Sequence, residues 1–170
     1  ELASTLEFSP KAFDGLARAI MTTDTRPKQA TATCTLGGKT VHIAGCAKGA
    51  GMIHPNMATM LAFVFTDAAV APRVLDRALR EIVARTFNSI TVDGDSSTND
   101  TLLVLANGAS GAKLITQAKG ADFAKFVVAL EHVCKSLALG IVEDGEGATH
   151  VVEIEVRGAP NDRTAKKVAE

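Results

Sequence analysis

The adjacent glycines Gly37 and Gly38 constrain the fold most strongly, because they separate two β-rich runs. The runs cover residues 30–36 and 39–43. Paired glycines between such runs favour a two-residue hairpin turn, whose two central residues both take positive φ values. The sequence therefore predicts an antiparallel pair of strands in the first third of the chain.

Patterns typical of helices and of strands alternate along the rest of the chain. The expected segments, in order, are a helix capped by Ser9 with Pro10 in its first turn, a strand at 59–66, a helix at 72–87, a strand at 102–105, a helix capped by Asp122 and a half-exposed strand at 151–157. A glycine-rich loop is expected from Gly45 to Gly51. No repeat or linker interrupts this order. The sequence predicts an α/β fold with helices packed on a mixed sheet.

Charge and composition exclude several classes of function. The 18 Lys and Arg balance 19 Asp and Glu to a net charge of −1, and Trp and Tyr are absent. A broad nucleic-acid interface needs a basic excess, and a membrane span needs roughly 18–20 apolar residues in a row. The three cysteines have no spacing typical of a disulfide framework or a zinc site. We expect reduced thiols in a cytoplasmic protein with no nucleic-acid or membrane partner.

Motifs for phosphate and metal binding are incomplete. Residues 49–51 lack the third glycine of a dinucleotide-binding loop, and residues 108–113 lack the spacing of a P-loop. The run beginning at Asp93 starts like a calcium loop but has Thr98 and Val104 where glycine and glutamate are needed. The four histidines show no zinc-binding spacing. No metal and no cofactor are expected.

An acidic loop contains Glu143, Asp144 and Glu146, with glycines between and after them. Two interpretations fit this pattern. The loop is a solvated turn, or one carboxylate binds a cationic group of a substrate through a charge-assisted hydrogen bond. Composition does not choose between them.

The most unusual stretch covers residues 48–61, where glycines and a proline lead up to a predicted strand that Thr59 opens. An internal threonine is a weak nucleophile, since nothing removes its proton. If the bond before Thr59 were cut, the freed α-amine, with a pKa near ~8, could act as the base. From the residues alone, a strand-starting threonine is the simpler interpretation, because threonine favours strands.

The stretch 48–61 resembles the autoprocessing segment of the ornithine acetyltransferase family, the bifunctional glutamate N-acetyltransferases of arginine biosynthesis. The resemblance extends over essentially all 170 residues. Three more motifs occur in the family's order, at 19–25, 87–101 and 144–149. Four long motifs in one order are highly specific.

The resemblance implies an N-terminal-nucleophile-like fold, similar to that of DmpA, and cleavage between Ala58 and Thr59. Residues 1–58 would be the C-terminal part of an α chain and residues 59–170 the N-terminal part of a β chain. Thr59 would accept the acetyl group of N2-acetylornithine and pass it to glutamate, and some members also use acetyl-CoA. The α and β chains of the family associate and pair further, which implies a heterotetramer.

Four substrate-binding residues follow from the same resemblance, namely Thr25, Lys48, Thr59 and Glu146. Lys48 suits a carboxylate, Glu146 suits an ammonium, and Thr25 offers a hydroxyl donor. Asp93 and the polar residues after it, Asp95 and Asn99, are expected to hold a tight turn near the site. The family's oxyanion hole and a C-terminal substrate-binding segment have no counterpart in the sequence, so we expect a central fragment that is incomplete at both ends.

Two other hypotheses remain open. An N-terminal-nucleophile amidohydrolase or aminopeptidase would pass the acyl group to water, and acetate would then appear without glutamate. An inactive truncated fragment would keep its chain uncut on prolonged incubation.

Overall fold

A computed structural model describes residues 9–54, 60–95 and 99–169. Its elements, in chain order, are α1 (Pro10–Ala19), β1 (Lys28–Leu36), β2 (Lys39–Lys48), β3 (Leu61–Thr66), α2 (Pro72–Arg85), the short 3₁₀ helix η2 (Phe87–Ser89), β4 (Thr101–Ala106), α3 (Ala121–Glu143) and α4 (Asp162–Ala169). The start of α1 is the one that the sequence predicts, because the Ala12 amide donates to Ser9 Oγ at 3.1 Å.

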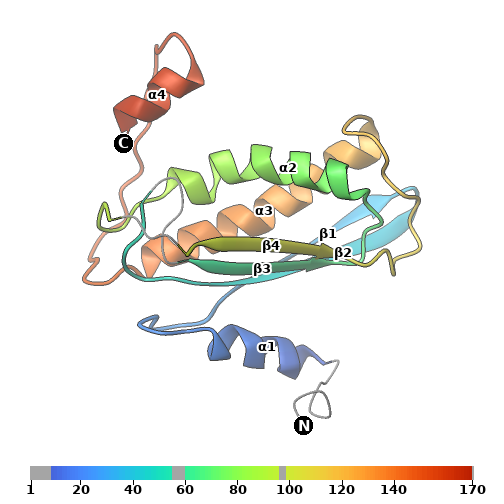
Figure 1. Cartoon of the computed structure of the whole chain (residues 1–170), viewed down its shortest axis with the longest axis horizontal. Helices are drawn as coiled ribbons and strands as arrows, with labels where there is room; N and C mark the ends of the chain where they lie inside the picture. The colour runs from blue at the N-terminus through green and yellow to red at the C-terminus, as the bar shows by residue number, and fades with distance from the viewer. Residues whose placement is uncertain (1–8, 55–59, 96–98, 170) are drawn as a thin grey trace.

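The four strands form one mixed sheet in the order β1-β2-β3-β4 (Figure 1). β1 and β3 are antiparallel to β2, whereas β3 and β4 are parallel. Gly37 and Gly38 take φ values of 55° and 81°, which confirms the hairpin. The parallel pair requires a crossover connection, and α2 lies within it. The predicted α/β class with helices on a mixed sheet is confirmed.

The core lies between the sheet and one layer of helices. α2 and α3 cover one face of the sheet, and α1 lies on the opposite face (Figure 1). The fully buried side chains include Phe126, Leu130, Val133 and Leu137 of α3 and Val41, Ile43 and Val64 of the sheet. None of the described helices is long and apolar enough to cross a membrane.

Gly45 lies inside a strand, so the predicted loop from Gly45 to Gly51 starts too early. β2 continues to Lys48. A Cβ added at Gly45 would lie 2.9 Å from Leu137 Cδ1 and 3.0 Å from Val133 Cγ1. Gly45 is therefore a packing residue that lets α3 approach the sheet, and a pattern of glycines does not reveal that role.

Two further predictions about elements are wrong. Residues 151–157 form no strand, and Val152 and Ile154 are 76% and 63% exposed. An alternating segment needs a neighbouring strand for its hydrogen bonds, and no strand of the described residues pairs with it. Gly120, rather than Asp122, is the N-cap of α3, and Asp122 lies in the first turn.

The strand register sets the position of the candidate site. Lys48, the last residue of β2, lies opposite Leu61, the first residue of β3. Leu61 in turn lies opposite Thr101 at the start of β4. The end of β2 and the starts of β3 and β4 therefore lie side by side at one end of the sheet. The loop that follows β2 and the residues that lead into β3 and β4 lie at the same end.

Candidate functional site

A buried cluster of charge joins segments that lie far apart in the sequence. The Lys28 ammonium donates to Asp24 Oδ1 and to Asp144 Oδ2, the latter at 2.5 Å. Side-chain exposure is 3% for Lys28, 0% for Asp24 and 4% for Asp144. We call these three residues the buried trio. Its two carboxylates and one ammonium are stable in the interior only because backbone and side-chain donors surround the carboxylates.

Asp24 holds the segment that follows Lys48. Its Oδ1 accepts the Gly49 amide at 2.7 Å, and its Oδ2 accepts the Thr22 amide at 3.1 Å. Burial favours a raised pKa at Asp24, but the hydrogen bonds from Gly49, Lys28 and Thr22 outweigh it and lower the pKa. The carboxylate is therefore ionised at neutral pH and fixes the backbone next to Lys48.

Asp144 holds Thr25. Its carboxylate accepts the Thr25 amide at 3.0 Å and the Thr25 hydroxyl. Burial works to raise the pKa of Asp144, but hydrogen bonds from Lys28 and Thr25 prevail and lower the pKa to about 2. The hydroxyl hydrogen of Thr25 is thus committed to Asp144. The structure contradicts the expected donor role of this hydroxyl, because a hydroxyl has one hydrogen to donate.

Lys48 is nearly buried, with 8% exposure, and its Nζ donates to Thr22 Oγ1 at 3.1 Å. Its charge also acts on Asp100. Burial raises the pKa of Asp100, and the Met60 amide and the Lys48 charge offset the rise only in part. Lys48 is therefore held at the sheet end by Thr22, and its charge acts on a second segment through Asp100.

Glu146 lies beside the loop that follows Lys48. Its amide donates to the Ala50 carbonyl oxygen at 2.7 Å. Its carboxylate lies against Gly51, since a Cβ added there would be 3.0 Å from the Glu146 Cδ and Oε2 atoms. Glu146 itself is exposed, so its carboxylate is accessible to a ligand.

The Asp93 and Asp95 part of the predicted tight turn is confirmed, and Asp93 also reaches the loop that follows Lys48. Asp93 Oδ1 accepts the Asp95 amide at 3.2 Å. Asp93 also accepts the amides of Met52 and Ile53, at 2.5 and 3.0 Å. Met52 has a φ of 56°, an uncommon value for a residue other than glycine, and Asp93 stabilises this conformation.

Ala58 and Thr59, the predicted cleavage site and nucleophile, lie outside the described residues. The next residue, Met60, is held in position by hydrogen bonds of its backbone. Its amide donates to Asp100 Oδ1 at 2.5 Å, and its carbonyl oxygen accepts the Thr101 amide at 2.9 Å. Met60 is thereby fixed at the sheet end where Lys48 also lies.

The comparisons with known proteins point to one family. The family model described as the ArgJ family matches residues 1–170. The chain belongs to the ArgJ family. Among its relatives, the protein named arginine biosynthesis bifunctional protein ArgJ from Geobacter sulfurreducens is 58% identical over 157 residues, which are 92% of this chain and 39% of that protein. The ArgJ of Lactococcus lactis is 52% identical over 153 residues, or 90% of this chain and 38% of that protein.

A solved structure of ArgJ shares the fold. The crystal structure of the protein from Bacillus halodurans matches with a TM-score of 0.59 and 47% sequence identity. The match covers 62% of this chain and 49% of that one. The chain spans about two fifths of the length of the curated ArgJ relatives it matches.

Three residues of the candidate site carry no signal that local reasoning uses. Asp24 and Lys28 stand four positions apart in a polar run, and Asp100 ends a polar loop. Such residues are usually solvated.

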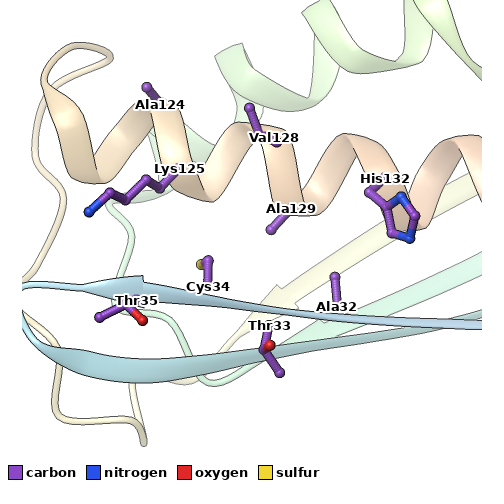
Figure 2. A pocket seen from close by; sticks show the side chains of 9 residues that line it. All are labelled: Ala32, Thr33, Cys34, Thr35, Ala124, Lys125, Val128, Ala129 and His132. Carbon is purple, nitrogen blue, oxygen red and sulfur yellow. The ribbon is translucent and has the colours of Figure 1, made fainter.

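A hollow between β1 and α3 is separate from the candidate site. Figure 2 shows the side chains that line it, with Ala32 and Cys34 of β1 pointing toward α3 and Ala129 of α3 pointing toward β1. The lining residues are Ala32, Thr33, Cys34, Thr35, Ala124, Lys125, Val128, Ala129 and His132. None of the residues predicted to bind substrate is among them, and no carboxylate lines the hollow.

Proposed function

We propose that the chain is part of a bifunctional ornithine acetyltransferase and glutamate N-acetyltransferase of arginine biosynthesis. One observation carries the proposal. Thr25, Lys48 and Glu146, which come from three distant segments, lie around one buried trio at the sheet end where Met60 is fixed. Because Met60 directly follows Thr59 in the sequence, this arrangement supports the proposal that Thr59 is the nucleophile for these substrate-binding groups.

The proposed reaction begins with cleavage of the chain. The Thr59 hydroxyl attacks the carbonyl carbon of Ala58, the peptide nitrogen becomes the free α-amine of Thr59, and water hydrolyses the resulting ester. The α-amine then accepts the hydroxyl proton as Thr59 attacks the acetyl group of N2-acetylornithine. Ornithine leaves with that proton, and the amine of glutamate takes the acetyl group from the threonine oxygen. No cofactor is needed, and acetyl-CoA is an alternative donor.

Charge at the site suits these substrates. The ammonium of Lys48 would bind a carboxylate of N2-acetylornithine or glutamate. The exposed carboxylate of Glu146 would bind the side-chain ammonium of N2-acetylornithine. Opposite charges at the two ends of the substrate would orient its acetyl group toward Thr59.

The two products of cleavage would stay together. Residues 1–58 would belong to an α chain and residues 59–170 to a β chain, with the cut between β2 and β3. These two strands pair from Ile43 opposite Thr66 to Lys48 opposite Leu61. Backbone hydrogen bonds and a shared core therefore join α to β without a covalent link. We further propose an αβ heterotetramer that works in the cytoplasm.

The intact mass of the purified protein tests the cleavage. For the wild type, we expect two chains that result from cleavage between Ala58 and Thr59. Thr59→Ala should remain one uncut chain, and Thr59→Ser should be cleaved in part. Thr35→Ala, at an exposed position of β1, is the matched control and should be cut like the wild type. A Thr59→Ala protein that still splits at this bond would contradict the mechanism.

Acetyl transfer tests the rest of the proposal in the full-length protein. Deacetylation of N2-acetylornithine should require glutamate and should yield N-acetylglutamate. Acetate released at the same rate without glutamate would instead indicate an amidohydrolase. A wild-type chain that remains uncut and inactive would indicate a fragment without catalysis.

A further inference from the structure

The buried trio connects the segments that carry Thr25, Lys48 and Glu146, yet none of its members is one of the predicted substrate ligands. We propose that Lys28, Asp24 and Asp144 form the positioning centre of the substrate site, and that Asp144 makes the Thr25 hydroxyl oxygen an acceptor for a cationic group of the substrate. This inference rests on the proposed function and assigns roles that the reaction scheme does not use.

Lys28 is the link between the two carboxylates. It contacts Asp24, which holds the Gly49 amide beside Lys48, and Asp144, which lies two residues before Glu146. The segments of Lys48, expected to bind a carboxylate, and of Glu146, expected to bind an ammonium, are thus both linked to the buried Lys28 ammonium. Because a buried charge without its partner is strongly unfavourable, these segments cannot move apart independently.

Asp144 determines whether the Thr25 hydroxyl donates a hydrogen bond to a ligand or accepts one from it. The lowered pKa of Asp144, at about 2, keeps its carboxylate an acceptor at neutral pH. The Thr25 hydroxyl must therefore donate its hydrogen inward, and its lone pairs remain for a donor from outside. Thr25 is an exposed residue, so a ligand can approach it from outside. Because Asp144 lies two residues before Glu146, the donor that fits such an acceptor is an ammonium.

Helix α3 has a glycine where Lys28 passes. A Cβ added at Gly140 would lie 3.3 Å from Lys28 Cγ. Glycine inside a helix costs about 1 kcal/mol relative to alanine, so its presence there needs a reason. The aliphatic part of Lys28 provides one, since it occupies the space that a larger residue would need.

The surface supplies a matched control for the trio. Arg26 Nη2 lies 2.8 Å from Glu143 Oε2, so this pair links the same two segments as Lys28 and Asp144 do. Both side chains are about half exposed, at 53% and 51%. An exposed pair contributes little to stability or position, so substitutions at Glu143 should not affect substrate binding.

The test compares KM values for the two substrates in the full-length protein. In Asp144→Asn, the new amide N–H group can donate to the Thr25 oxygen, which removes the acceptor. We expect KM for N2-acetylornithine to rise about tenfold, the loss of roughly one hydrogen bond to a charged group, with kcat and the KM for glutamate changed less than about twofold. Glu143→Gln should leave both KM values unchanged.

A merely structural role would give a different result. Equal increases in both KM values, or no increase in either, would overturn the assignment to the cationic group. If Asp144→Asn does not fold, Thr25→Val and Thr25→Ser decide the question. Thr25→Val should raise the KM for N2-acetylornithine and Thr25→Ser should not, and an unchanged KM in Thr25→Val would overturn the inference.

Different results would contradict the proposed function and the positioning role. A wild-type protein without glutamate-dependent acetyl transfer would contradict it, and the inference would fall with it. Normal transfer by the wild type with unchanged KM values in these variants would overturn the positioning role alone.

Discussion

The Lys28 ammonium and the Asp144 carboxylate lie 2.5 Å apart, although 116 positions separate them in the sequence. The contact joins the first residue of β1 to the C-cap residue of α3. Both side chains are almost completely buried. The fold therefore contains an ion pair whose two members depend on each other, and its removal should be measurable as a loss of stability.

Replacing Lys28 by methionine should destabilise the protein by about 3–5 kcal/mol, because two carboxylates then remain buried without their counter-charge. Arg26→Met, which removes the exposed pair with Glu143, should cost at most about 1 kcal/mol. Unfolding in urea gives both values. A loss at Lys28 no larger than that at Arg26 would show that the ion pair contributes nothing.

Asp144 should make stability depend on pH at the acidic end. Its pKa falls from 3.8 to about 2 on folding, so the ionised form stabilises the folded state above pH 4 by about 2 kcal/mol. This contribution is lost as the pH falls from about 4 through 2. The difference in unfolding free energy between wild type and Asp144→Asn should shrink over that range, and a difference independent of pH would contradict the assignment.

Asp100 should make the stability depend on pH in the direction opposite to that of Asp144. Burial raises its pKa, and its Oδ2 is buried with no hydrogen-bond partner among the described residues. The ionised carboxylate therefore opposes folding, and any stability that Asp100 provides is present at low pH and lost as the pH rises through the raised pKa.

Asp100→Asn is neutral and can still accept the Met60 amide through its carbonyl oxygen. The variant should raise the unfolding midpoint at pH 7 by roughly 2–4 °C, which is the shift expected when a domain of this size gains about 1 kcal/mol of stability. Thermal unfolding followed by circular dichroism measures the shift. A lower midpoint at pH 7 would mean that the charge of Asp100 favours the folded state.

Gly45→Ala should destabilise the protein by about 1–3 kcal/mol. The new methyl group would lie within 3.1 Å of the side chains of Leu137, Val133 and Val64, so α3 would have to move away from the sheet. Gly15→Ala in α1 is the control, since nothing lies within 4 Å of the added atom, and it should stabilise by about 0.5–1 kcal/mol. Urea unfolding of the two variants should therefore give opposite signs.

Local signals in the sequence were enough to predict several elements. Ser9 and Pro10 start α1, and Gly37 and Gly38 form the turn between β1 and β2, because each effect involves only neighbouring residues. The mixed α/β class follows from the alternation of such segments. The failed strand at 151–157 marks the limit of this reasoning, because a strand requires a partner that the segment itself does not specify.

The sequence by itself determined the local turns and the α/β class, and motif resemblance predicts the set Thr25, Lys48, Thr59 and Glu146. Only the tertiary structure decided how Thr25, Lys48 and Glu146 are held and which way the Thr25 hydroxyl points. The physical reason is that burial gives Lys28 its role. A lysine four residues after an aspartate is ordinary on a surface, and it becomes a positioning group only where the fold excludes water and brings Asp144 to it.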